Sequence, residues 1–101
     1  MTVHKPRFDR DGDLLRCTTM IGNQRGLHAR AATKFVKLAA GFDAEVTVTK
    51  RRQSVSGRSI LGLMMLGAGP GTELEITAIG REAEEAIEVL GKIVEDKFEE
   101  D

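Results

Sequence analysis

One of the two histidines lies where the sequence predicts the start of a helix. His28 follows Gly26, and small and apolar residues at helical spacing begin directly after it. The start of a helix presents unpaired backbone N–H groups and a partial positive charge, which together favour a bound anion. Arg30 adds a fixed cation whose guanidinium can bind two phosphate oxygens at once. Neutral imidazole is nucleophilic near pH 7, so the stretch predicts a histidine that accepts a phosphoryl group. The same spacing also suits a histidine that merely fills a polar surface position.

A second candidate site surrounds Ser59. A serine before the apolar run 60–66, with Gly67 after it, predicts a short helix whose first turn is capped by the serine hydroxyl. Almost every residue of the run is large and apolar, and one helix face cannot bury them all. Some of these apolar side chains are therefore expected to remain exposed. An exposed apolar patch usually marks a contact surface, although core packing of the whole run is the alternative.

The periodicity of apolar residues predicts the elements that must position these side chains. Strands are expected where every second residue is apolar, and helices where apolar residues recur at three- and four-residue spacing. The predicted strands are 14–21, 44–49, 53–56 and 73–78, and the predicted helices are 29–40, 60–66 and 82–95. The order β-α-β-β-α-β-α predicts one α+β domain, in which a four-stranded antiparallel sheet carries three helices on one face.

The two ends of the chain are expected to add little to this domain. Residues 1–13 are charged and contain Pro6 and Gly12, so we expect a flexible N-terminal extension before a single domain that spans 14–101. The acidic tail 98–101 is expected to fray.

The composition excludes several classes of protein. A net charge of −1, with no Trp, no Tyr and only four Phe, argues against a nucleic-acid-binding protein. The sequence has no apolar run of about 18 residues and no apolar leader, so neither a membrane span nor a secretory signal is expected. The lone Cys17 permits no internal disulfide and fits a reducing cytoplasm. No second ligand lies beside His28 in the sequence, so we expect no metal and no cofactor. His4 and the basic run 50–52 are expected to be solvated.

Two motifs give the chain a resemblance to a known family. The run Gly26–Ala32 resembles the active-site motif of HPr, the histidine phosphocarrier of the phosphoenolpyruvate-dependent phosphotransferase system. The run Arg58–Leu66 resembles the second motif of that family, and the likeness covers residues 14–97 in the family's order and spacing. It implies the family's open-faced β-sandwich. The segment Phe42–Val46, together with the run 63–66, is most similar to the nitrogen-related branch.

The resemblance also implies a role for each candidate residue. His28 matches the histidine that Enzyme I phosphorylates on Nδ1 with phosphoenolpyruvate, and that passes the phosphoryl group to an EIIA-type protein. Arg30 matches the arginine beside the phosphohistidine, and Ser59 matches the serine that HPr kinase/phosphorylase modifies in many bacteria. The family usually has proline where this chain has Ala31, so the helix is expected to begin less rigidly. The difference bears on the rate of transfer and not on its chemistry. Ile60, Leu61 and Met64 match the family's exposed apolar contact residues, so partner contact and at least partial exposure are implied for these three. Leu63 and Leu66 are expected in the core.

Together these features favour a cytoplasmic, monomeric phosphocarrier, which is a substrate of its partner enzymes and not itself an enzyme. One alternative is a regulatory binding module that signals through Ser59 and no longer relays phosphate. Retention of both His28 and Arg30 disfavours it. Another alternative is an unrelated α+β adaptor whose motifs match by coincidence. A buried His28, or one far from any helix start, would support that hypothesis.

Overall fold

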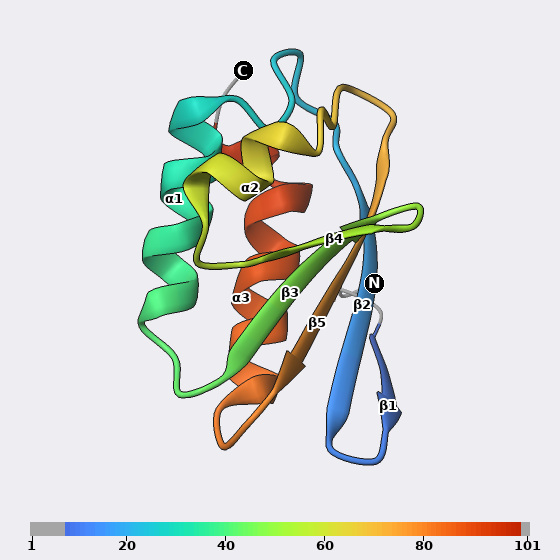
Figure 1. Ribbon diagram of the computed structural model, residues 1–101, viewed down its shortest axis with the longest axis vertical. Helices are drawn as coiled ribbons and strands as arrows, with labels where there is room; N and C mark the ends of the chain where they lie inside the picture. The colour runs from blue at the N-terminus through green and yellow to red at the C-terminus, as the bar shows by residue number, and fades with distance from the viewer. Residues whose placement is uncertain (1–7, 100–101) are drawn as a thin grey trace, which may run out of the picture.

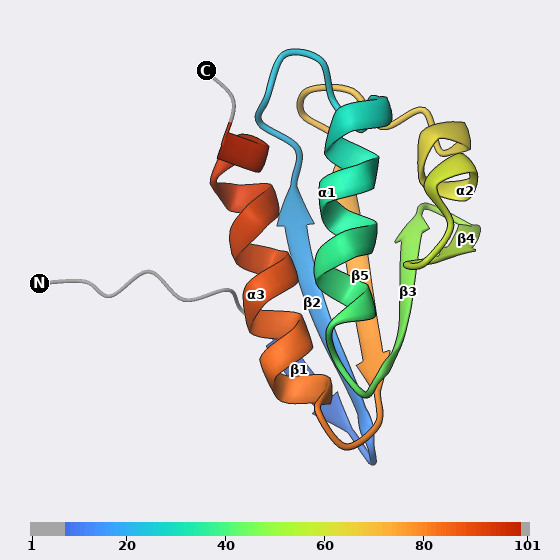
Figure 2. The ribbon, with the colours of Figure 1, turned by 90° about the vertical axis from the view of Figure 1, so that its left-hand side faces the viewer.

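The computed structural model describes residues 8–99, which form a sheet and a layer of helices (Figures 1 and 2). The helices lie on one face of the sheet: they stand in front of the strands in Figure 2 and to one side of them in Figure 1. The strands are β1 Phe8–Asp11, β2 Leu14–Met20, β3 Glu45–Lys50, β4 Gln53–Ser56 and β5 Glu73–Ile79. The helices are α1 Ala29–Ala40, α2 Ile60–Met65 and α3 Ala83–Glu95, followed by a 3₁₀ turn, η1 Lys97–Glu99. The expected α+β class, with three helices on one face of an antiparallel sheet, is confirmed.

The middle of the sheet supplies one side of the core. Its strand order is β1-β2-β5-β3-β4, and every neighbouring pair is antiparallel. Cys17 of β2 and Val48 of β3 lie directly opposite Ile76 of β5, one on each side, and all three side chains are fully buried. Because successive side chains of a strand point to opposite faces, this row faces the helices while its neighbours along each strand face away.

The two long helices close the core from the other side. α1 buries Ala32, Phe35 and Ala39, which recur at helical spacing, and α3 buries a similar stripe that includes Ile87 and Leu90. Burial of a large aliphatic or aromatic side chain contributes roughly 1.5–3 kcal/mol, so these stripes hold both helices against the sheet. Within residues 8–99, no helix has the length and apolar character needed to cross a membrane.

The sheet has five strands and not the four expected, because residues 8–11 form an edge strand. Phe8 lies opposite Cys17 and packs against the core, and Arg10 reaches Glu84 of α3 at 3.3 Å. Gly12, with φ +62°, begins the two-residue loop that joins β1 to β2. Charged residues are common on edge strands as well as in flexible tails, so the charge of residues 8–11 does not distinguish the two. Residues 1–7, which belong to the same predicted flexible extension, lie outside the described residues.

The end of the chain is also more ordered than expected. Phe98 is fully buried, so the prediction of a fraying tail is wrong for this residue. Lys97, Phe98 and Glu99 have φ values of 58°, 55° and 61°, which turn the chain back towards the helices. The ammonium of Lys34 on α1 donates a hydrogen bond to the carbonyl oxygen of Phe98 at 2.8 Å. Burial of one aromatic ring and this charged hydrogen bond offset the strain of three left-handed residues. Residues 100 and 101 lie outside the described part.

Candidate functional site

His28 directly precedes α1 and caps it. Its backbone is extended, with φ −77° and ψ 177°, and its Nδ1 accepts a hydrogen bond from the backbone N–H of Arg30 at 3.2 Å. The imidazole is half-buried. Its Nδ1 therefore lies at the end of the helix where unpaired N–H groups and the helix dipole favour negative charge. The expected position of His28 at a helix start is confirmed.

The first turn of α1 is regular without a proline. Ala31 is fully buried, and the N–H of Ala32 donates to the carbonyl oxygen of His28 at 2.8 Å. Arg30 is exposed, and within residues 8–99 no hydrogen bond or ion pair fixes its guanidinium. The guanidinium is thus two residues from the imidazole and can move onto an anion held there.

The loop 22–28, which ends at His28, is held in place by the segment that connects α2 to β5. Gly26 has φ +63°, and a β-carbon at this position would overlap the carbonyl oxygen of Ala68. The N–H of Leu27 donates to that same oxygen at 2.9 Å. The fully buried side-chain amide of Asn23 donates to the carbonyl oxygen of Gly26 at 2.9 Å. Only glycine combines this backbone angle with such a close approach, which explains its place two residues before the histidine.

The other end of the same loop is fixed to the same segment. Ile21, the residue after β2, donates its N–H to the carbonyl oxygen of Thr72 at 2.9 Å and accepts from Gly71 at 2.8 Å. The loop 22–28 is therefore anchored at both ends to residues 68–72, which connect α2 to β5.

Ser59 caps α2 as expected. Its hydroxyl oxygen accepts a hydrogen bond from the N–H of Gly62 at 2.9 Å, and the residue is half-buried. Leu63 and Leu66 are buried, as the sequence predicted. The exposed apolar side chains of α2, with their exposed fractions, are Ile60 39%, Leu61 68%, Met64 41% and Met65 67%. We call these four residues the α2 patch. Met65 was not among the expected contact residues, although the excess of apolar residues in the run pointed to it.

Lys50, which was predicted to be solvated, binds the end of α2. The ammonium of Lys50 donates to the carbonyl oxygen of Leu66 at 2.9 Å and to that of Gly67 at 3.3 Å. α2 has no basic residue in its own last turn. The prediction that the run 50–52 is solvated is wrong for Lys50, because unpaired carbonyls at a helix end attract a cation. No local signal reveals a contact between β3 and α2.

The single thiol is not available for chemistry. Cys17 is fully buried, and burial, with a smaller contribution from the charge of Glu95, raises the pKa of its thiol to about 11. The thiolate is the reactive form, so this residue is inert at neutral pH. Among residues 8–99, no three His, Cys, Asp or Glu side chains are grouped as a metal site would require.

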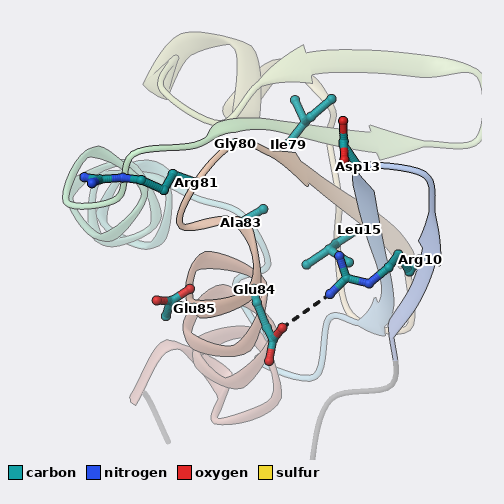
Figure 3. Close-up of a pocket in the computed structure, with 9 residues that line it drawn as sticks. All are labelled: Arg10, Asp13, Leu15, Ile79, Gly80, Arg81, Ala83, Glu84 and Glu85. Carbon is teal, nitrogen blue, oxygen red and sulfur yellow. Dashed lines mark hydrogen bonds and ion pairs between the residues drawn. The ribbon is translucent and has the colours of Figure 1, made fainter.

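A pocket of about 410 Å³ lies where the β1–β2 hairpin meets the start of α3 (Figure 3). It is at the opposite end of the molecule from the start of α1 (Figure 2). The charged side chains that line it are Arg10, Asp13, Arg81, Glu84 and Glu85. Figure 3 shows the ion pair between Arg10 and Glu84, both of which line the pocket. Two arginines and three carboxylates give this lining a net negative charge, which disfavours a phosphate, so the start of α1 remains the stronger candidate.

Comparison with known proteins identifies the class to which this fold and site belong. The family described as "PTS HPr component phosphorylation site" matches residues 15–96. The chain is 42% identical over 80 residues to the phosphocarrier protein NPr of Shewanella violacea, which covers 79% of this chain and 88% of that protein. It is also 42% identical over 85 residues to the phosphocarrier protein HPr of Neisseria meningitidis, covering 84% of this chain and 96% of that protein. The chain belongs to the HPr family and has a phosphocarrier role in the phosphotransferase system.

Solved structures agree with this assignment. The crystal structure of HPr-C-His from Thermoanaerobacter tengcongensis superposes with a TM-score of 0.81 at 40% identity, over 85% of this chain and 97% of that one. The phosphocarrier protein HPr from Bacillus anthracis gives a TM-score of 0.77 at 36% identity, over 80% and 96% of the two chains. The expected open-faced β-sandwich is therefore confirmed. β1 lies before residues 15–96, the region that the family model matches.

Proposed function

We propose that the chain carries a phosphoryl group on Nδ1 of His28. Enzyme I supplies the group from phosphoenolpyruvate, and an EIIA-type protein receives it. One observation carries the proposal: Nδ1 of His28 lies 3.2 Å from the backbone N of Arg30, at the start of α1. This atom is a nucleophile placed where the product, a phosphate dianion, is stabilised by backbone N–H groups and by the helix dipole.

The geometry suits transfer in both directions. The lone pair of Nδ1 attacks phosphorus, an N–P bond forms, and the bond between phosphorus and the donor group breaks. Nε2 keeps its proton, and the N–H of Arg30 is then free to donate to a phosphate oxygen. The exposed guanidinium of Arg30 reaches the same oxygens and balances charge on the transferring group. Transfer to the acceptor runs the same steps in reverse.

The α2 patch gives the carrier a surface for its partners. α1 and α2 lie side by side in the helical layer, so a partner seated on α2 also reaches the start of α1 (Figure 2). Two of the four patch residues are methionines, whose flexible, polarisable side chains adapt to partners of different shape. We infer that the carrier works as a monomer in the cytoplasm, where its patch is free for each partner in turn.

Ser59 is proposed as a regulatory site for an HPr kinase/phosphorylase. Its hydroxyl oxygen accepts the N–H of Gly62, so a phosphate on this oxygen would retain a backbone donor. Phosphorylation adds about −1.5 to −2 charges beside Ile60, an exposed member of the α2 patch. Such a charge opposes docking of an apolar partner surface. If the chain proved to be a regulatory module without a relay, Ser59 would be its active residue.

The test is phosphorylation of the wild-type chain, His28→Ala and His4→Ala by Enzyme I and phosphoenolpyruvate. His4 is the only other histidine, so His4→Ala is the matched control. We expect an acid-labile phosphohistidine in the wild type and in His4→Ala, and none in His28→Ala. Phosphorus NMR should assign the linkage to Nδ1. Absence of label in the wild type, with Enzyme I active on another carrier, would refute the relay.

A further inference from the structure

A contact between β3 and the end of α2 fixes the segment that follows this helix. The ammonium of half-buried Lys50 donates to the carbonyl oxygens of Leu66 and Gly67, at 2.9 and 3.3 Å. Helix ends leave such carbonyls without partners within the helix, and a cation is the favoured partner. No residue of the last turn of α2 supplies one. Lys50 therefore fixes the direction in which the chain leaves α2.

A second contact follows in the next peptide unit. Gly67, with φ +64°, turns the chain, and the carbonyl oxygen of Ala68 accepts the N–H of Leu27 at 2.9 Å. The side chain of Ala68 is buried, which anchors this unit from the other side. The direction of the Ala68 carbonyl depends on the φ and ψ angles of the residues before it, and the hydrogen bonds of Lys50 to the carbonyls of Leu66 and Gly67 restrict those angles.

The last connection to the histidine is covalent. Leu27 precedes His28, so the direction of the Leu27 backbone sets where the imidazole projects from the start of α1. Gly26 has no β-carbon and lies against the same carbonyl of Ala68, which leaves the loop no room to shift inwards. A displacement of about 1 Å at a reacting atom is enough to slow a transfer substantially.

We propose that Lys50 is a positioning residue for His28, acting through the end of α2 and the backbone of Leu27. The inference deepens the proposed phosphoryl transfer at His28 and depends on it for its functional consequence. The hydrogen bonds of Lys50 go to Leu66 and Gly67, which are not members of the α2 patch, so its effect belongs to the rate of transfer once the partner is bound. The neighbouring Arg52 is exposed and, within residues 8–99, makes no ion pair or hydrogen bond through its side chain.

The experiment compares Lys50→Met, Lys50→Arg and Arg52→Met in the full-length chain. Methionine keeps the length of the lysine stem and removes the donor, whereas arginine keeps a cation that can bind two carbonyls. Amide hydrogen exchange measured by NMR reports the Leu27 N–H without any partner protein. In Lys50→Met this amide should exchange about tenfold faster, because the acceptor carbonyl is no longer fixed. Lys50→Arg and Arg52→Met should resemble the wild type, and the amide of Ile76 in the sheet should be unchanged in all three.

Phosphorylation by Enzyme I supplies the second readout. In Lys50→Met we expect kcat to fall about fivefold or more while KM changes less than about twofold. Lys50→Arg should restore kcat. Equal Leu27 exchange in Lys50→Met and Arg52→Met would overturn the proposal, as would faster exchange with an unchanged kcat. Faster exchange at Ile76 as well would show general destabilisation and would also overturn it. Failure of the wild type to be phosphorylated would refute the relay, while Leu27 exchange would still decide whether Lys50 fixes this loop.

Discussion

The backbone N–H of Arg30 donates to Nδ1 of His28 at 3.2 Å, so one donor serves the imidazole before transfer and can serve the phosphate after it. In the unphosphorylated chain this bond orients the ring and caps α1. In the proposed phosphorylated chain the same N–H meets a phosphate oxygen, which carries more negative charge than the ring nitrogen. The helix start is therefore more favourable to the product than to the free imidazole, without any change of fold.

Arg30→Ala should slow phosphoryl transfer without destabilising the fold. The guanidinium is exposed and no contact within residues 8–99 fixes it, and alanine is an excellent helix former. We expect the rate of phosphorylation of His28 to fall about tenfold to a hundredfold. The free energy of unfolding, measured with urea, should change by less than about 0.5 kcal/mol. A wild-type transfer rate in this variant would show that Arg30 has no role in the transfer.

Gly26→Ala should destabilise the protein more than Gly12→Ala. Both glycines have nearly the same left-handed backbone, with φ +63° and +62°, but only Gly26 lies against a carbonyl oxygen, that of Ala68. The left-handed conformation alone costs an alanine about 1 kcal/mol, which is the loss expected for Gly12→Ala. Urea unfolding should show a loss of more than about 3 kcal/mol for Gly26→Ala, because backbone must move. Equal losses would show that the loop can relax.

Substitutions at Ser59 should separate its capping role from its proposed modification. Ser59→Ala removes the acceptor for the N–H of Gly62 and should cost about 1 kcal/mol of stability in urea unfolding. Ser59→Asn keeps a capping oxygen and should stay within about 0.5 kcal/mol of the wild type. Neither variant should be phosphorylated by an HPr kinase/phosphorylase, whereas both should accept phosphate at His28. Loss of the His28 phosphate in Ser59→Asn would contradict this separation.

The parts of the fold that could be predicted are those with local signals. The start of α1 after Gly26 and the cap of α2 at Ser59 each follow from a few consecutive residues, and both lie where the sequence placed them. The alternation of β2 and β5 was equally visible. Motif and periodicity therefore located the starts of α1 and α2.

The parts that could not be predicted depend on contacts between distant residues. Lys50 reaches α2 across a separation of 16 residues, and Lys34 reaches Phe98 across 64. A basic turn and an acidic tail have the composition of solvated segments, and only the folded chain shows what they meet. For β1 a local signal did exist, since Asp11 and Gly12 are typical of a tight hairpin, but the surrounding charge concealed it.

Phe98→Ala should show that the end of the chain belongs to the domain. The ring is fully buried, so its removal leaves a cavity and should lower the free energy of unfolding by about 3–5 kcal/mol. Phe8→Ala is the matched control, because Phe8 is only half-buried at the edge of the sheet and should cost less. Differential scanning calorimetry of both variants gives the comparison. A smaller loss for Phe98→Ala than for Phe8→Ala would contradict the full burial of the Phe98 ring.

Stability should decrease at alkaline pH through Cys17. Burial raises the pKa of this thiol from 9.0 to about 11, so the folded state holds the proton more tightly than the unfolded state. The resulting stabilisation is complete below pH 9 and is lost as pH rises to about 11, with a total of about 3 kcal/mol. Urea unfolding of the wild type and Cys17→Ala across pH 7–11 measures it. The difference between the two should be constant below pH 9 and shrink above it; a constant difference throughout would refute the shift.

The pairing of β2 with β5 has a consequence for how the chain is made. Leu14 of β2 lies opposite Ile79 of β5, so the centre of the sheet joins the beginning of the domain to its end. Synthesis proceeds at roughly 5–20 residues per second, so β2 is made several seconds before β5. The β1–β2 hairpin, joined by a two-residue loop, needs no later residue and can form within microseconds. Pairing with β1 therefore protects one edge of β2 before β5 is available, and an unpaired strand edge is prone to aggregate.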